Sequence, residues 1–218
     1  MKRILNRIPA MLLAAILLAA PVCAAQTDYT DVPENAWYEE AVRTVTERGW
    51  MNGTGSGKFS PNATLTRAML ATVLWRMENC PAAAATGNFT DTVRGSWYDG
   101  GVSWCVAEGI FQGFPDGSFR PNDAITREQL AVVFYRYANA KPTGAAAKAS
   151  VKNGCSWALD ACAWANAEGL FTDALGTLDL CAPASRAEIA YWLAHFDVET
   201  SASSLTEGSF EGLGYLLY

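Results

Sequence analysis

The chain has 218 residues and a formal net charge of −6, from 16 lysines and arginines against 22 aspartates and glutamates. An acidic chain without a basic cluster is not expected to bind nucleic acid. Because it has one histidine and no Cys-x-x-Cys pair, a structural zinc site is not expected, and the sequence predicts neither a metal nor a cofactor.

The N-terminus, residues 1–25, has the layout of a secretory signal peptide. Three basic residues within the first seven positions precede the apolar run Met11–Ala20, and small residues follow near Cys23. A membrane-spanning helix needs about 20 apolar residues, so this run is too short. We therefore expect residues 1–25 to be removed and the mature chain to have no membrane span.

The remainder of the chain repeats itself. A tryptophan and a glycine each recur at an interval of 60 residues, and an arginine recurs at intervals of 60 and 59 residues. The positions are Trp37, Trp97 and Trp157; Gly49, Gly109 and Gly169; and Arg67, Arg127 and Arg186. One short unit cannot bury its own apolar face, so three such units are expected to pack on one another.

Each unit is predicted to be a helix, a loop and a second helix. The first helix opens at the tryptophan and ends at the glycine, which suits a left-handed C-terminal cap. In the second unit the loop is Gly113–Pro121 and contains a Pro-Asp-Gly turn, whereas the third unit keeps little of it. Leu130, Val133 and Phe134 begin a stripe typical of an amphipathic second helix. The predicted fold class is mainly α.

The second helix starts, in all three units, with a hydroxyl residue followed by an arginine. The pairs are Thr66–Arg67, Thr126–Arg127 and Ser185–Arg186. The hydroxyl is expected to cap the helix, and Gln129 or Glu188 can complete a capping box, whereas Met69 cannot. A cation in the first turn is unfavourable by ~0.3–1 kcal/mol. A bound anion is the simplest reason for it, because unpaired N–H groups at a helix start attract one.

These signals divide the chain. The predicted units span residues 26–80, 88–140 and 153–197, with linkers at 81–87 and 141–152 and a C-terminal tail at 198–218. Five cysteines would remain after cleavage, and pairing among Cys80, Cys155 and Cys181 is left open, while Cys105 and Cys162 are expected to be helix fillers.

Other prominent residues have structural interpretations. Trp104 and Trp164 are expected to pack between units, and Asp116 to form a turn. Asp31 and Asp91 are expected to cap the segments that follow them, with a place lining a groove as the alternative. His195, near the end of the last helix, is expected to be structural because a cation there suits the helix dipole. For Trp37, Trp97 and Trp157, core packing and contact with a sugar remain alternatives.

Taken together, the motifs resemble the S-layer homology (SLH) family. The second unit carries the closest likeness, in Phe89–Asp91, Trp97–Tyr98, Gly113–Pro121 and Ile125–Gln129. The third unit is similar mainly in Trp157, Gly169 and Ser185–Glu188. The resemblance implies a pseudo-threefold prism around a central helical bundle, with grooves between the repeats.

The resemblance also implies a function. It is non-covalent binding of secondary cell wall polymer, often a pyruvylated polysaccharide linked to peptidoglycan, by a secreted protein of the cell wall or S-layer. The family's functional arginine corresponds to Arg67, Arg127 and Arg186. The adjoining Thr66, Thr126 and Ser185 are included as ligand residues, and Trp37, Trp97 and Trp157 as candidates for stacking on a sugar.

The chain departs from the family pattern. Met69 replaces the motif acid, and the third unit lacks the Phe-Thr-Asp lead and the Pro-Asp-Gly loop. Not all grooves are therefore expected to bind, the third least of all. The alternatives are an adaptor that recruits an unknown protein through its tail, and a wall hydrolase. No repeated acid pair or nucleophile–base pair supports the hydrolase, so no catalytic residue is predicted.

Overall fold

A computed structural model describes residues 29–82, 89–171 and 178–196, and this part of the chain is mainly helical, as predicted. The helices are α1 (Glu39–Glu47), α2 (Arg67–Met77), α3 (Asp99–Ala107), α4 (Arg127–Tyr137), α5 (Ala145–Ala149), the 3-10 turn η1 (Ser156–Ala158), α6 (Leu159–Ala167) and a last helix over residues 186–196. The predicted signal peptide and tail lie outside the described residues. None of the described helices is long and apolar enough to cross a membrane.

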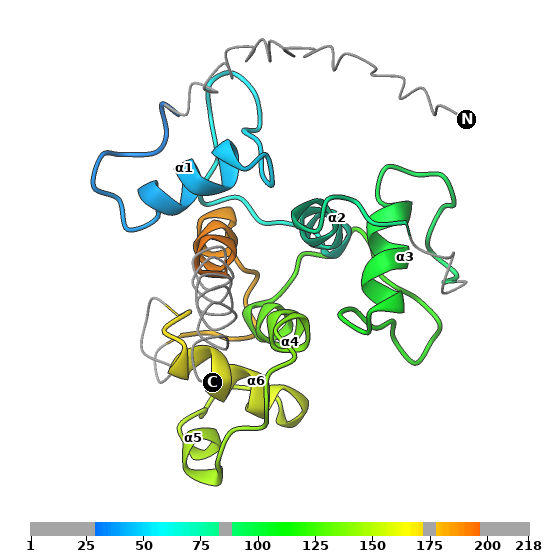
Figure 1. The fold of residues 1–218 in the computed structure, drawn as a ribbon. Coiled ribbons are helices and arrows are strands. Elements are labelled where there is room, and N and C mark those ends of the chain that lie inside the picture. The colour runs from blue at the N-terminus through cyan, green and yellow to red at the C-terminus, as the bar shows by residue number, and fades with distance from the viewer. Residues whose placement is uncertain (1–28, 83–88, 172–177, 197–218) are drawn as a thin grey trace, which may run out of the picture.

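The three second helices form the centre of the molecule. Figure 1 shows α2, α4 and the helix over 186–196 side by side, with α1, α3 and α6 around them. Helix α3 packs on α2 and α6 packs on α4, so each outer helix covers the inner helix of the preceding unit. The Trp37 and Tyr191 rings, 5.7 Å apart, join the first unit to the last helix in the same way. This is the prism that the resemblance implied.

The core consists of the apolar stripes of the inner helices. Leu70, Leu130 and Ile189 are fully buried at equivalent positions. The Phe134 ring lies 5.3 Å from that of Trp192 and 5.1 Å from that of Phe196, which ties α4 to the last helix. Burying a side chain of this size stabilises the fold by about 1.5–3 kcal/mol. Trp104 and Trp164 are also buried, as predicted.

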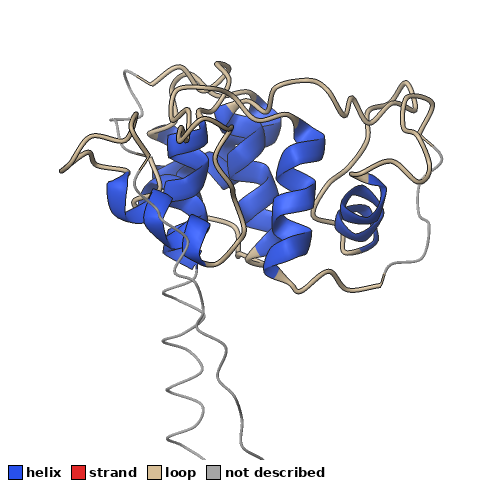
Figure 2. Cartoon of the chain, turned by 90° about the horizontal axis from the view of Figure 1, so that it is seen from above, coloured by secondary structure: helices blue, strands red, loops and turns tan. Residues whose placement is uncertain are grey.

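Backbone bridges close the three units into a ring. Each residue that caps an inner helix pairs with the segment before the inner helix of the next unit: Thr66 with Ala124, Thr126 with Pro183, and Ser185 with Thr64. Since the third unit pairs with the first, the ring has no open edge. The long loops lie at one end of the bundle (Figure 2).

The predicted caps are present. Thr66 and Thr126 accept hydrogen bonds from the N–H groups of Met69 and Gln129, and Gln129 completes a capping box. Ser185 and Glu188 form the equivalent box in the third unit. Gly49, Gly109 and Gly169 end the outer helices with φ of +70°, +71° and +69°.

Three details differ from the sequence predictions. Asp31 and Asp91 do not cap the segments that follow them. Each accepts two backbone N–H bonds from the distant loop of its own unit, Asp91 from Phe119 and Arg120 at 2.7 Å. The linker at 141–152 contains α5, which packs on α6.

Candidate binding grooves between the repeats

Arg67 reaches across the seam between the first and second units. Its Nε donates to the Phe119 carbonyl oxygen (2.9 Å) and its Nη2 to that of Gln112 (3.0 Å). The guanidinium also lies within 5.2 Å of three phenylalanine ring centroids, those of Phe111, Phe114 and Phe119. Burial lowers the pKa of Arg67 to about 10, so the side chain remains charged at neutral pH.

Arg186 repeats this geometry at the seam between the third and first units. Its Nε donates to the Phe59 carbonyl oxygen (2.9 Å) and its Nη2 to that of Asn52 (2.7 Å). Phe59 and Asn52 stand where the second unit has Phe119 and Gln112. The two arginines are therefore held by the same contacts, each in the loop of the unit that follows in the ring.

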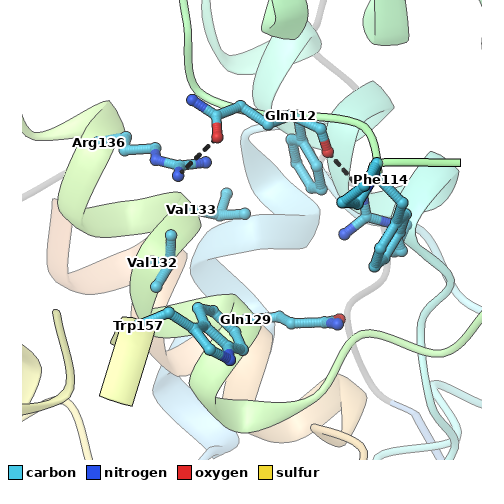
Figure 3. A pocket seen from close by; sticks show the side chains of 10 residues that line it. Gln112, Phe114, Gln129, Val132, Val133, Arg136 and Trp157 are labelled. Carbon is cyan, nitrogen blue, oxygen red and sulfur yellow. Dashed lines mark hydrogen bonds between the residues drawn. The ribbon is translucent and has the colours of Figure 1, made fainter. Parts of the chain in front are cut away.

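The first groove opens beside Arg67 and has a volume of about 440 Å³. Val132, Val133 and Trp157 supply an apolar wall, and Gln112 and Arg136 close one side (Figure 3). Arg136 donates from Nη2 to the Gln112 Oε1 at 3.1 Å. The residues come from all three units, so this groove exists only in the assembled prism.

A second groove of about 220 Å³ lies beside Arg186. Its residues match those of the first groove position by position: Arg186 corresponds to Arg67, Asn52 to Gln112, Met69 to Gln129, Thr72 to Val132, Arg76 to Arg136, and Trp97 to Trp157. The chain therefore contains two grooves that are lined by equivalent positions of the repeats.

Both grooves are positively charged. Each is lined by two arginines, and none of the described residues that line either groove is acidic. This contrasts with the net charge of −6 of the whole chain. Because apolar walls exclude water, a ligand carboxylate placed between the two guanidinium groups would be strongly attracted.

At the remaining seam, between the second and third units, the arginine is paired with a carboxylate of the protein itself. Arg127 donates from Nε and Nη2 to the carboxylate of Glu188, at 2.5 and 3.2 Å, and from Nη1 to the Asp179 carbonyl oxygen at 3.1 Å. Glu188 stands where the grooves have Gln129 and Met69, and His195 where they have Arg136 and Arg76. The charge of Arg127 is neutralised within the protein.

The prediction that unpaired N–H groups at the starts of the inner helices attract an anion is wrong, because these groups are already hydrogen-bonded within the protein. The N–H groups of Arg67 and Ala68 donate to the Asp123 and Pro121 carbonyl oxygens of the next unit, and that of Met69 donates to its cap, Thr66. The other two helix starts use their first N–H groups in the same way. The hydroxyls of Thr66, Thr126 and Ser185 are engaged as caps, so an anion would have to meet guanidinium groups in the grooves.

Comparison with known proteins identifies the repeated segments. Residues 28–69 and 88–131 match the S-layer homology domain. These two segments are S-layer homology repeats. The third unit follows the same helix and bridge pattern, and we infer that it is a diverged third repeat.

Similar proteins carry such repeats as small parts of longer chains. The chain is 31% identical over 148 residues to a surface layer protein of Brevibacillus choshinensis, covering 66% of this chain and 13% of that protein. It is 32% identical over 115 residues to an S-layer protein of Bacillus thuringiensis subsp. finitimus (52% of this chain, 14% of that protein). It is 30% identical over 109 residues to an amylopullulanase of Thermoanaerobacterium thermosulfurigenes (50% and 6%).

The tryptophans that open the S-layer homology repeats are not core residues. Trp37, Trp97 and Trp157 are 50%, 59% and 56% exposed, and Trp97 and Trp157 line the two grooves. Of the two interpretations left open by the sequence, core packing is therefore wrong. Arg76 and Arg136 were missed, although their recurrence 60 residues apart, at the next-to-last position of α2 and α4, was available in the sequence.

Proposed function

We propose that this protein attaches to the bacterial cell envelope by binding a carboxylate-bearing wall polysaccharide in the two grooves. One observation carries the proposal: in an acidic protein, two matched grooves each place two arginines and an exposed tryptophan around an apolar wall. Pyruvylated secondary cell wall polymer is a ligand of this chemistry, since each pyruvate ketal adds a carboxylate to a sugar.

Each part of the groove has a role in this interpretation. Arg67 is positioned by two carbonyl groups through Nε and Nη2, and among the described residues its Nη1 donates no hydrogen bond. Nη1 and the Arg136 guanidinium are then the donors for a ligand carboxylate. Trp157 offers an exposed ring face to the apolar side of a sugar, and Val132 and Val133 exclude water.

The proposed role is anchoring rather than catalysis. Relatives include S-layer proteins and a hydrolase, and the matched segment makes up 6% of that hydrolase. We therefore attribute no hydrolytic activity to this chain. The cell surface is the location that such a role requires.

The ligand side of the proposal can be tested with purified cell walls. The protein should co-sediment with untreated walls, and mild acid treatment that removes ketals should abolish most of the binding. A pyruvylated disaccharide should compete, and the same disaccharide without its ketal should not. Equal binding to treated and untreated walls would contradict the proposal.

A further inference from the structure

Three potential metal ligands converge at the seam between the second and third repeats. Glu128 lies in the first turn of α4, Cys155 precedes η1, and Cys181 lies in the loop before the last helix. One carboxylate oxygen of Glu128 and both sulfur atoms lie within 4.8 Å of one another. The Cys155 N–H donates to Glu128 Oε2 at 3.0 Å and fixes the carboxylate toward the sulfurs.

Glu128 is an unusual residue for its position. Its side chain is buried, with 6% of the residue exposed. Among the described residues no lysine, arginine or histidine forms an ion pair with it. Burying a carboxylate without a countercharge is costly. The helix start and the Cys155 N–H favour the charge, but neither explains why two thiols adjoin it.

The internal repeats supply a comparison within one chain. At the two equivalent seams, the positions of Glu128, Cys155 and Cys181 are held by Ala68, Gly95 and Asn122, and by Ala187, Asn35 and Asn62. All three donor groups thus occur together at one seam and are absent from the other two. A disulfide between the cysteines would explain two of these differences and leave the buried carboxylate unexplained, whereas a bound cation explains all three.

We propose that Glu128, Cys155 and Cys181 bind one divalent cation of the zinc class, which links the second repeat to the third. Two thiolates and a carboxylate are ligands that zinc accepts. In a tetrahedral site the donors lie roughly 3.5–3.8 Å apart, given bonds of about 2.0–2.3 Å. Because Cys155 and Cys181 are exposed, small rotations of their side chains can reach this spacing, and solvent can take the fourth position.

Binding changes protonation but not oxidation state. The cation replaces the two thiol protons, which pass to solvent, and the carboxylate adds the third negative group. The net charge of the filled site is then −1. The site also lies two residues from Trp157, a wall of the first groove, so the cation would fix that part of the third repeat.

The test uses cadmium ion as the probe on the reduced, metal-free protein. We expect one Cd²⁺ per chain, with the ultraviolet charge-transfer absorption of a thiolate complex, and displacement by Zn²⁺. Cys155→Ser and Cys181→Ser should each abolish the absorption. Glu128→Gln should keep the absorption and weaken binding about tenfold or more. Cys80→Ser, an exposed cysteine outside the cluster, should change nothing.

Folding and oxidation are controlled separately. Glu128→Ala installs the residue found at the other two seams and should fold normally, as circular dichroism would show. The proposal is overturned if the reduced protein gives no thiolate absorption, or if Glu128→Gln binds Cd²⁺ as tightly as the unaltered protein. It is also overturned if the protein purified without reductant contains a Cys155–Cys181 disulfide and fails to bind Cd²⁺ after reduction.

Discussion

The carboxylate of Glu188 accepts two hydrogen bonds from Arg127 across the seam between the second and third repeats, at 2.5 and 3.2 Å. The equivalent arginines of the other two repeats face Gln129 and Met69 instead, and each lines an open groove. One repeated arginine therefore has two roles in a single chain. Arg67 and Arg186 line open grooves that a ligand can enter, whereas Arg127 forms an ion pair with Glu188.

Replacing Arg127 should affect folding more than wall binding. Arg127→Ala leaves the partly buried Glu188 carboxylate without its partner, and we expect a loss of about 2–3 kcal/mol in the free energy of unfolding. Wall binding per folded molecule should fall less than twofold, because the ion pair already occupies this arginine. Urea unfolding and wall co-sedimentation would measure the two effects. A loss of wall binding per folded molecule greater than twofold would contradict this role.

The same pair should make stability depend on acid. Burial raises the pKa of Glu188, but hydrogen bonds from Arg127 and Ser185 outweigh this effect and hold it below the ordinary value of 4.5. A depressed pKa gives stability that is fully present above pH 4.5 and is lost as the pH falls through the folded-state value. Urea midpoints at pH 7 and pH 3 should therefore differ less in Glu188→Gln than in the unaltered protein. Glu47→Gln, on an exposed site, is the control.

Arg67 should be required for the fold as well as for the groove. Its side chain is 5% exposed and donates to two carbonyl groups of the next repeat. Lysine cannot reproduce both bonds, so Arg67→Lys should lower the free energy of unfolding by about 2–4 kcal/mol. Arg43→Lys on the exposed face of α1 should change it by less than about 0.5 kcal/mol. Similar stabilities for the two variants would show that the buried bonds contribute little.

Asp91 should stabilise the loop of the second repeat. It accepts the N–H groups of Phe119 and Arg120, each at 2.7 Å, and the latter residue has a φ of +58°. Asp91→Asn keeps the shape but removes the charge and one acceptor, and we expect a loss of about 1–2 kcal/mol. Asp116→Asn, in the exposed turn, is the matched control and should have a smaller effect. Thermal unfolding of both variants would measure this difference, and equal losses of stability would contradict the prediction.

The exposed tryptophans should act on binding and not on folding. Trp97→Ala and Trp157→Ala should each reduce affinity for walls several-fold while leaving the unfolding midpoint nearly unchanged, because both rings are more than half exposed. Trp164→Ala removes a buried ring and should instead cost about 3–5 kcal/mol. If the exposed variants bind walls normally, the ring faces do not contact the sugar.

Much of the architecture was predictable because its signals are local. The capping residues, the C-terminal glycines and the apolar stripes each act within one or two helical turns, and their 60-residue recurrence revealed the repeats. Trp104 and Trp164 were placed correctly, since they lie on the inward face of a helix.

The partners of the arginines were not predictable. Arg67 contacts Gln112, 45 residues away, and Arg186 contacts Asn52, 134 residues away, through backbone carbonyls that carry no residue-specific signal. The convergence of Glu128, Cys155 and Cys181 also depends on the packing of the second repeat against the third, so a search for closely spaced cysteines misses it. Helix α5 was missed because its sequence, Ala145–Ala149, resembles a linker.

The most direct test of the account is the wall affinity of a chain in which both outer groove arginines are neutralised. Arg76→Gln combined with Arg136→Gln leaves the buried Arg67 and Arg186 in place, so the fold should be kept, as unfolding curves would verify. We expect at least a tenfold loss of affinity for untreated walls, against little change in an Arg43→Gln plus Arg127→Ala control. Unchanged affinity in the groove variant would show that the two grooves do not hold the wall polymer.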